Sequence, residues 1–275
     1  MSNNPFEKKI ILIAGASGGI GSVLLDKLVD SGARIIAVYK NNLPMPRTNE
    51  NILLVKADLQ NPEEWDSLLQ LVYQNHGRID ILINCIGVLI PGNFINHTEE
   101  QTTEMINTNF LSVIIGTRKA LELMQENGSG HIVNLGSVGG IIPMPYSSVY
   151  CATKFALRGF THSLANELKN TRVKISLISP GPVLTKMLER EANHSKTAIA
   201  FINKAIEPAK VADAVIKVLQ KPRTEVIVPA YLSFSANVFF FFPGIFSASY
   251  NLIEKIGWRR KRILLKKQFE LSLQK

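Results

Sequence analysis

The sequence has few of the features that mark secreted and membrane-spanning proteins. Its 275 residues include only two cysteines, Cys85 and Cys151, too few for a disulfide framework. Both fall in segments that we expect to be buried, so we interpret them as free thiols in a reducing compartment. Residues 1–9 (MSNNPFEKK) contain no apolar run, which argues against a signal peptide. These absences favour a cytoplasmic location.

Acidic residues are scarce at the C-terminal end. The formal net charge is +9, and from Trp258 onward seven basic residues stand against one acidic residue, Glu270, a net of +6. The rest of the chain is therefore close to neutral. A basic tail is typical of contact with anionic lipid or nucleic acid, but the remaining sequence contains no nucleic-acid-binding motif, so we expect no nucleic acid partner. The seven basic residues are Arg259, Arg260, Lys261, Arg262, Lys266, Lys267 and Lys275.

Hydrophobic patterning predicts an α/β fold. Apolar residues make up 46% of the chain, and its length fits one large domain. Seven short runs that are mostly apolar indicate strands buried on both faces, and they alternate with segments of helical periodicity. This alternation predicts a doubly wound, Rossmann-type parallel sheet of about seven strands with helices on both faces. The expected strands are residues 10–14, 35–39, 52–56, 79–84, 132–135, 173–178 and 226–228, and the expected helices are about 20–30, 62–74, 99–125 and 149–168.

Two segments break this alternation. Residues 182–205 are polar and irregular, and we expect them to form a substrate lid within a catalytic domain over residues 1–229. Residues 230–275 lie beyond the last expected strand and form an extension that is apolar and then basic.

The extension allows three interpretations. Its apolar part, from Phe234 to Ile245, is about a dozen residues long, too short to cross a bilayer, and Pro243-Gly244 would interrupt a helix. A spanning helix is therefore the least favoured. Residues 230–265 could contact the cytoplasmic face of a membrane peripherally, with a basic flank toward the lipid. They could equally cover the substrate cleft or pack at a subunit interface.

A glycine-rich turn follows the first expected strand and leads directly into a helix. It runs from Gly15 through Ser17, Gly19 and Ile20 to Gly21. A tight turn needs residues without Cβ, and a pyrophosphate can approach closely only where the backbone is bare. The helix N-terminus then supplies N–H donors and a positive dipole end. We interpret the segment as a dinucleotide-binding loop, the alternative being a purely structural turn.

Tyr150 and Lys154 lie four residues apart near the start of an expected helix, so they share one helix face. A free phenol has a pKa of about 10, too high for acid/base work near neutral pH. The lysine ammonium and the helix N-terminus both favour the phenolate and would lower that pKa. A tyrosine–lysine pair alone is weak evidence, so the interpretation depends on the motifs around it.

The spacing of Gly15, Gly19 and Gly21 resembles the fingerprint of the short-chain dehydrogenase/reductase family. The similarity continues from about residue 9 to about residue 228. It implies an oxidoreductase that transfers a hydride between a nicotinamide cofactor and a carbonyl or alcohol, without a metal.

The same resemblance implies a catalytic role for each of four residues. Tyr150 would donate or remove the proton of the reacting oxygen, and Ser137 would orient that oxygen. Lys154 would hold the nicotinamide ribose and lower the Tyr150 pKa. Asn109, on the long expected helix, would support a water that relays protons to solvent.

Further cofactor contacts follow from the resemblance. Asp58 and Leu59, after the third expected strand, match the segment that contacts adenine. Asn84 and Gly87 match the turn after the fourth strand, although Cys85-Ile86 departs from the family's Asn-Ala, so we expect altered packing there. The segment that closes over the nicotinamide is matched by Pro180, Gly181, Val183 and Thr185.

The end of the second expected strand predicts the coenzyme. A carboxylate there would hydrogen-bond the ribose 2′-hydroxyl of NAD and repel a 2′-phosphate. This chain instead has Lys40 after Tyr39, and a cation would attract the phosphate. We therefore favour NADP(H) over NAD(H), the alternative for Lys40 being a solvated lysine.

The expected pocket is apolar, which predicts a lipophilic carbonyl or alcohol and a place in lipid metabolism, the alternative for its apolar residues being ordinary loop packing. The stretch before Tyr150 also resembles that of steroid-acting family members, which implies a steroid-like substrate. We expect a homodimer or homotetramer, because family members commonly pair through their two long helices. The alternatives of another class are a non-catalytic dinucleotide-binding protein and a membrane-associated scaffold. The apolar residues around the pocket are Ile141, Ile142, Met144, Tyr146, Met187 and Leu188.

Overall fold

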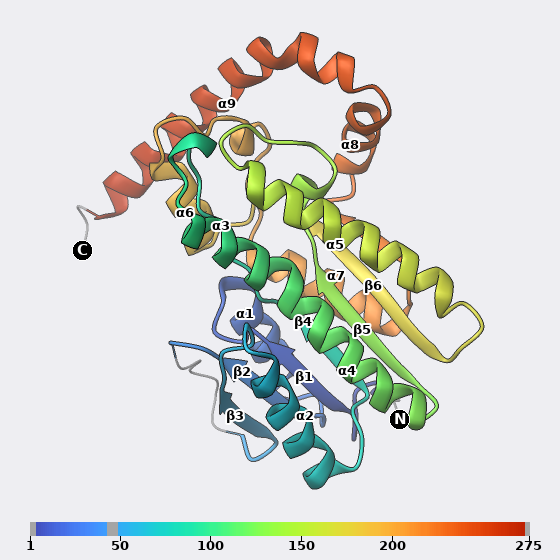
Figure 1. The fold of residues 1–275 in the computed structure, drawn as a ribbon. Helices are drawn as coiled ribbons and strands as arrows, with labels where there is room; N and C mark the ends of the chain where they lie inside the picture. The colour runs from blue at the N-terminus through green and yellow to red at the C-terminus, as the bar shows by residue number, and fades with distance from the viewer. Residues whose placement is uncertain (1–3, 43–48, 273–275) are drawn as a thin grey trace.

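Seven parallel strands form one sheet in the computed structural model, which describes residues 4–42 and 49–272 (Figure 1). The strands are β1 Ile10–Ala14, β2 Arg34–Tyr39, β3 Ile52–Lys56, β4 Ile81–Asn84, β5 Gly130–Leu135, β6 Val173–Pro180 and β7 Glu225–Val228. Their order is β3-β2-β1-β4-β5-β6-β7, so the predicted doubly wound parallel sheet is confirmed. Residues 1–3, where we expect no signal peptide, lie outside the described residues, as does Lys275 of the basic tail.

Helices cover both faces of the sheet. They are α1 Gly19–Leu28, α2 Pro62–His76, α3 Glu99–Ile106, α4 Ser112–Glu126, α5 Ser148–Glu167, α6 Lys186–Asn193, α7 Pro208–Gln220, α8 Leu232–Phe241 and α9 Pro243–Ser272. Helices α2, α4 and α5 pack on one face, and α1 and α7 pack on the other (Figure 1). The chain reverses its winding direction between β1 and β4, and open sheets of this kind bind ligands at the carboxyl ends of the strands there.

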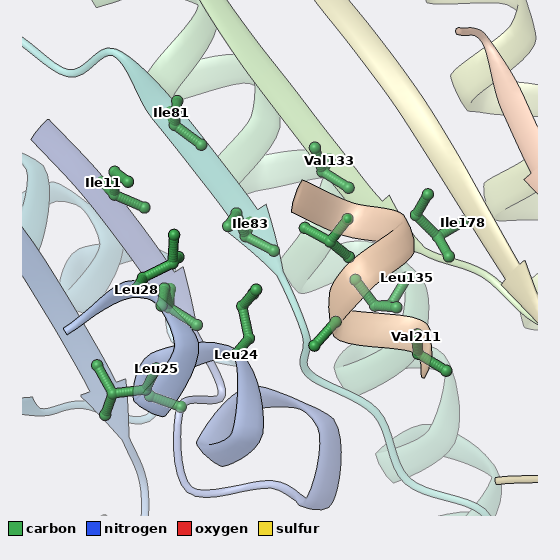
Figure 2. Packing of buried hydrophobic residues seen from close by; sticks show 14 of the residues in the cluster. Ile11, Leu24, Leu25, Leu28, Ile81, Ile83, Val133, Leu135, Ile178 and Val211 are labelled. Carbon is green, nitrogen blue, oxygen red and sulfur yellow. The ribbon is translucent and has the colours of Figure 1, made fainter. Parts of the chain in front are cut away.

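Each face of the sheet has its own core. Successive side chains of β1 point to opposite faces, and all of them are buried. Ile11 packs with Leu24 and Ile83 on the α1 side (Figure 2), whereas Leu12 belongs to the cluster that contains Trp65 on the α2 side. This two-sided burial explains why the strands are apolar without alternation.

Helix α2 begins where its sequence predicts and runs two residues beyond the expected end at about residue 74. Asn61 is the N-cap, and its side chain accepts a hydrogen bond from the Glu63 N–H at 3.2 Å. Pro62 follows at the first helical position, where the missing N–H costs nothing. The helix ends at Gly77, which has a left-handed φ of 69°.

The long helix expected over residues 99–125 is divided. A π-helical turn, Asn107–Leu111, separates α3 from α4. Such a turn inserts one residue into a helix, and it is often found at functional sites. Here it carries Asn109, which is fully buried. Hydrophobic periodicity does not reveal one inserted residue, so the break is a finding of the structure.

Helix α7 has no counterpart among the expected elements. Its sequence nevertheless contains the signals of a helix, since Pro208 occupies the first turn. Val211, Val215 and Val218 are buried at the spacing of one helix face. The helix covers the sheet next to α1 (Figure 1).

The lid and the extension lie together above the carboxyl ends of the strands (Figure 1). The lid contains α6 and a short 3-10 turn, Ile199–Phe201, and α9 packs against both. A Cβ on Gly257 of α9 would lie 2.1 Å from the Ala198 carbonyl oxygen, so the helix touches the lid backbone. The expected helix break is confirmed, because α8 ends just before Pro243 opens α9.

The basic segment of the extension is not uniformly exposed. Arg259 and Arg262 are exposed, but Lys261 is buried against the lid with an exposed fraction of 2%. The side chains of Lys266 and Lys267 lie outside the described part of the chain. None of the described helices combines the length and apolarity needed to cross a bilayer.

Two helical glycines make a matched test of the packing. A Cβ on Gly116 of α4 would lie 2.3 Å from the fully buried Trp65 ring, whereas a Cβ on Gly159 of α5 would meet nothing within 4 Å. We expect Gly116→Ala to lower the free energy of unfolding by about 1–3 kcal/mol. Gly159→Ala should raise it by up to about 1 kcal/mol through helix propensity. Urea unfolding measures both, and equal effects would contradict the packing described.

Candidate active site

The turn between β1 and α1 brings bare backbone to the carboxyl edge of the sheet. Gly15 has a φ of 85°, a left-handed conformation that favours glycine. A Cβ on Gly21 would lie 2.2 Å from the Gly15 carbonyl oxygen, so α1 starts directly against the turn. Ser17 and Ile20 are half-buried beside the first N–H groups of α1, which have no partner within the helix. This arrangement fits a pyrophosphate.

Lys40 and Asp58 lie together at the ends of β2 and β3. Lys40 Nζ is 2.8 Å from Asp58 Oδ2, and the two side chains are 49% and 39% exposed. Asp58 Oδ1 also accepts a hydrogen bond from the Gln60 N–H at 3.2 Å. The neighbouring Leu59 is buried, and its carbonyl accepts from the Trp65 indole N–H at 3.0 Å. Lys40 therefore already has an anionic partner, with which a phosphate would have to compete.

The side chain of Asn84 points into the core. Its Nδ2 donates to Asn134 Oδ1 at 2.8 Å and to Thr117 Oγ1 at 3.3 Å. Asn134 in turn donates to Thr161 Oγ1 at 3.0 Å. This buried network joins β4 and β5 to α4 and α5. It stabilises the strand ends, and it is a feature that the sequence motif does not indicate.

Gly87 lies between Asn109 and Lys154. A Cβ there would be 3.4 Å from Asn109 Oδ1 and 3.7 Å from Lys154 Nζ. The Asn109 amide clamps the backbone of Val88, accepting from its N–H at 2.7 Å and donating to its carbonyl at 2.8 Å. Lys154 Nζ donates to the Leu135 carbonyl at 2.9 Å. Through Asn109, the π-helical turn thus fixes the path of the backbone after β4 where it runs next to Lys154.

Glycines pack the Ser137 turn onto α5. The Ser137 hydroxyl accepts a hydrogen bond from the Gly139 N–H at 3.0 Å. A Cβ on Gly139 would lie 3.4 Å from the Tyr150 ring, and one on Gly140 would lie 2.6 Å from the Lys154 carbonyl oxygen. The serine and the tyrosine are therefore neighbours because no side chain separates the turn from the helix.

The Tyr150 phenol is a weaker acid in this site than the sequence predicts. Burial raises its pKa above the ordinary value, against a hydrogen bond from Ser137 that lowers it, and the charges of Glu191 and Cys151 raise it further. Burial also lowers the pKa of Lys154 to about 8. Lys154 Nζ lies 5.8 Å from the Tyr150 ring centroid. Desolvation therefore sets the direction of the Tyr150 pKa shift, and the lowering expected from Lys154 does not dominate.

The segment after β6 passes over the glycine turn. A Cβ on Gly19 would lie 2.6 Å from Thr185 Cγ2, so the start of the lid lies directly on the turn. Val183 forms an isolated parallel bridge with Ile206. A Cβ on Gly181 would lie 2.6 Å from the Leu232 side chain of α8. The extension therefore packs on the same segment that the resemblance assigns to the nicotinamide.

A cavity of about 310 Å³ joins these elements. Half of the predicted site residues line it, namely Ile20, Gly87, Ser137, Tyr150, Lys154, Pro180, Gly181, Val183 and Thr185. The other predicted residues do not line it, namely Gly15, Ser17, Gly19, Gly21, Lys40, Asp58, Leu59, Asn84 and Asn109.

The apolar wall of the cavity differs in part from the expected one. Ile142, Met144, Met187 and Leu188 line it as expected, whereas Ile141 is buried in the core. Tyr146 does not line it either, and its ring lies 6.5 Å from that of His194. Sequence reasoning leaves cleft cover by the extension as one of several alternatives and does not single out Glu191 of the lid. The extension contributes Leu232, Ser235, Phe239, Phe246 and Ile253.

Comparison with protein families agrees with this geometry. The model of the short chain dehydrogenase family matches residues 9–196, so the end of the lid and the whole extension lie beyond the match. An uncharacterized oxidoreductase of Staphylococcus saprophyticus is 30% identical over 229 residues, which are 80% of this chain and 93% of that protein. One of Staphylococcus epidermidis is 34% identical over 220 residues, which are 78% of this chain and 93% of that protein.

Solved structures share the fold. ElxO with NADP bound has 26% sequence identity and a TM-score of 0.73, with 82% of this chain and 99% of that chain covered. A short chain dehydrogenase/reductase from Burkholderia phymatum in complex with NAD has 20% identity and a TM-score of 0.78, with 88% and 96% covered. The second likeness supports the fold alone.

Proposed function

The chain belongs to the short-chain dehydrogenase family and is an oxidoreductase with a nicotinamide dinucleotide cofactor, and from this premise we propose that it interconverts a hydrophobic carbonyl compound and its alcohol with NADP(H), using Tyr150 as the acid/base. One observation carries the proposal. Ser137, Tyr150 and Lys154 line one apolar cavity that reaches Ile20 of the glycine turn. In this proposal, residues 1–229 form the catalytic domain and the extension is an addition to it.

The residues present fit the cofactor. The backbone at Gly15 and Gly21 is so close that side chains would fill the cradle, and the first N–H groups of a helix have no partner within it and can bind an anion. When bound, the cofactor supplies or accepts the hydride. The residues that would hold it are Gly15, Ser17, Gly19, Ile20 and Gly21 at the pyrophosphate, Lys40, Asp58 and Leu59 at the adenosine, and Gly87, Tyr150, Lys154, Pro180, Gly181, Val183 and Thr185 toward the nicotinamide. Asn84 would contribute only through its backbone, because its side chain bonds Asn134 and Thr117 in the core.

The protein's own groups then handle the proton. A phenol that carries its proton can donate it to a developing alkoxide, and Tyr150 lines the cavity in which the substrate would lie. Ser137, hydrogen-bonded to the phenol, orients the substrate oxygen and offsets its charge. Lys154 holds the cofactor ribose beside Tyr150. Asn109 fixes the Gly87–Val88 backbone and supports the water that returns a proton from solvent.

The residues that line the cavity suggest the class of substrate. Apolar side chains from the body, the lid and the extension line most of the cavity, which favours a lipophilic compound such as a lipid or a steroid-like ketone. We also propose a homodimer or homotetramer formed through α4 and α5.

Tyr150→Phe tests the mechanism. Removing the proton donor should lower kcat for NADPH-dependent reduction of hydrophobic ketones by about 10²- to 10⁴-fold. Coenzyme binding, measured by NADPH fluorescence, should be retained. Tyr231→Phe is the control, because Tyr231 is 62% exposed. A variant with wild-type kcat would contradict the role of Tyr150, and a protein that binds neither coenzyme would favour a non-catalytic protein.

Lys40→Ala tests the coenzyme preference. Lys40 follows β2 directly, and the end of this strand carries no acid. We expect kcat/KM for NADPH to fall by about tenfold with little change for NADH. Lys9→Ala is the matched control, since it breaks an ion pair with Asp80 at the other end of the sheet. An equal change with both coenzymes would contradict the assignment.

We propose that the extension also contacts a membrane at the cytoplasmic face. Phe241 and Phe242, where α8 meets α9, are 70% and 60% exposed, and Ile245 beside them is 50% exposed. The exposed Arg259 and Arg262 farther along α9 would complement anionic lipid. The apolar turn and the basic flank together favour a lipid surface.

Cosedimentation with vesicles tests the membrane contact. Phosphatidylcholine vesicles with phosphatidylglycerol should bind the protein, and Phe241→Ser with Phe242→Ser should weaken binding by at least about tenfold. The control is Tyr73→Ser, which removes an exposed aromatic ring from α2. If the double variant and the control bind as the wild type does, the extension serves only to cover the cleft.

A further inference from the structure

One carboxyl lies in the wall of this apolar cavity. Glu191 belongs to α6 of the lid, and its exposed fraction is only 6%. It is the single acidic residue among the described residues that line the cavity. Its neighbours in the wall include Met187 and Leu188, which are apolar. A carboxyl buried in such a place is costly unless something hydrogen-bonds it.

Lys261 does not supply that hydrogen bond. Its ammonium has three N–H donors, and three acceptors already surround it. These are the His194 carbonyl, the Thr197 carbonyl at 3.0 Å and the Thr197 hydroxyl at 3.1 Å. No described residue hydrogen-bonds the carboxyl oxygens of Glu191, although Lys261 lies close enough to favour its charged form. The Lys261 ammonium therefore offsets the charge of Glu191, and the carboxyl oxygens of Glu191 can still accept a hydrogen bond.

Glu191 lines the same cavity as Tyr150 and Ser137. Its charge raises the pKa of the Tyr150 phenol, so the two groups are within electrostatic reach. Burial raises the pKa of Glu191 itself to about 7, against the lowering effect of Lys261. In either protonation state the carboxyl can accept a hydrogen bond from a ligand.

We propose that Glu191 binds a hydroxyl group of the substrate that is separate from the reacting carbonyl. The substrate class is then a lipophilic hydroxyketone and, in the reverse direction, the corresponding diol. A neutral hydroxyl fits better than an ammonium group, because Lys261 already balances Glu191 and the Lys154 ammonium also lines the cavity. This inference rests on the proposed function, since it assigns the second polar contact in the same cavity.

The test compares 2-undecanone with 7-, 9- and 11-hydroxy-2-undecanone as substrates of NADPH-dependent reduction. In the wild type, kcat/KM for the best hydroxyketone should exceed that for 2-undecanone by about tenfold to a hundredfold. Glu191→Leu should remove this preference, measured within that variant as the ratio of kcat/KM for the hydroxyketone to kcat/KM for 2-undecanone. Glu189→Leu is the matched control, because Glu189 lies on the same helix with an exposed side chain. The control should retain the preference.

Glu191→Gln separates binding from a structural role. The amide keeps the shape and an acceptor oxygen, so part of the hydroxyl preference should return. If Glu191 served only to offset Lys261, both Glu191 variants would lower the melting temperature and leave the preference unchanged. That result would overturn the proposal, as would equal preferences in the wild type and Glu191→Leu.

A binding measurement distinguishes this inference from the proposed function. Calorimetry with 1,10-decanediol and 1-decanol requires no turnover. If the protein binds the diol more tightly than the alcohol through Glu191 but reduces no ketone, the Glu191 site stands and the oxidoreductase mechanism is rejected. If the protein reduces 2-undecanone but shows no preference for a hydroxyl group in turnover or binding, the mechanism stands and the Glu191 site is rejected.

Discussion

Close approach of backbone segments at the carboxyl edge of the sheet is the constraint on which the rest of the site depends. Gly21 touches the carbonyl of Gly15, Gly19 lies under Thr185, and Gly140 lies against α5. None of these contacts leaves room for a Cβ, so segments far apart in the sequence meet without side chains between them. These contacts place part of the polar lining of the cavity, because Ser137 belongs to the turn that contains Gly140 and Thr185 lies on Gly19.

The lid and the extension cover the cavity and pack on this edge of the sheet. The lid crosses the glycine turn, and the extension then packs on the lid and on Gly181. Lys261 joins the extension to the lid by hydrogen bonds to lid carbonyls. This residue of the basic tail is therefore a buried structural group. The same helices that close an apolar cavity expose Phe241 and Phe242 on their outer side. A lipophilic substrate and a lipid surface are therefore compatible with one arrangement of the extension.

Much of the fold is predictable from the sequence, because buried parallel strands such as residues 10–14 are apolar throughout and the glycine turn has a required spacing. The signals for α7 are also present in the sequence. The π-helical turn at Asn109 is not predictable, since one inserted residue leaves the apolar pattern almost intact. The raised pKa of Tyr150 and the pairing of Lys40 with Asp58 depend on burial and on neighbours from other segments, which a local motif does not encode. The burial of Glu191 in the lid is likewise a property of the folded chain that its local sequence does not indicate.

A crystal structure of the protein with NADP⁺ bound tests the central claim most directly, because the claim is that the glycine turn, Tyr150 and the lid form one site. We predict that the pyrophosphate lies at the N-terminus of α1, that the 2′-phosphate contacts Lys40, and that the nicotinamide enters the cavity beside Tyr150 under the lid. A complex in which the nicotinamide lies outside the cavity, or in which the lid and extension occupy its place, would contradict the claim.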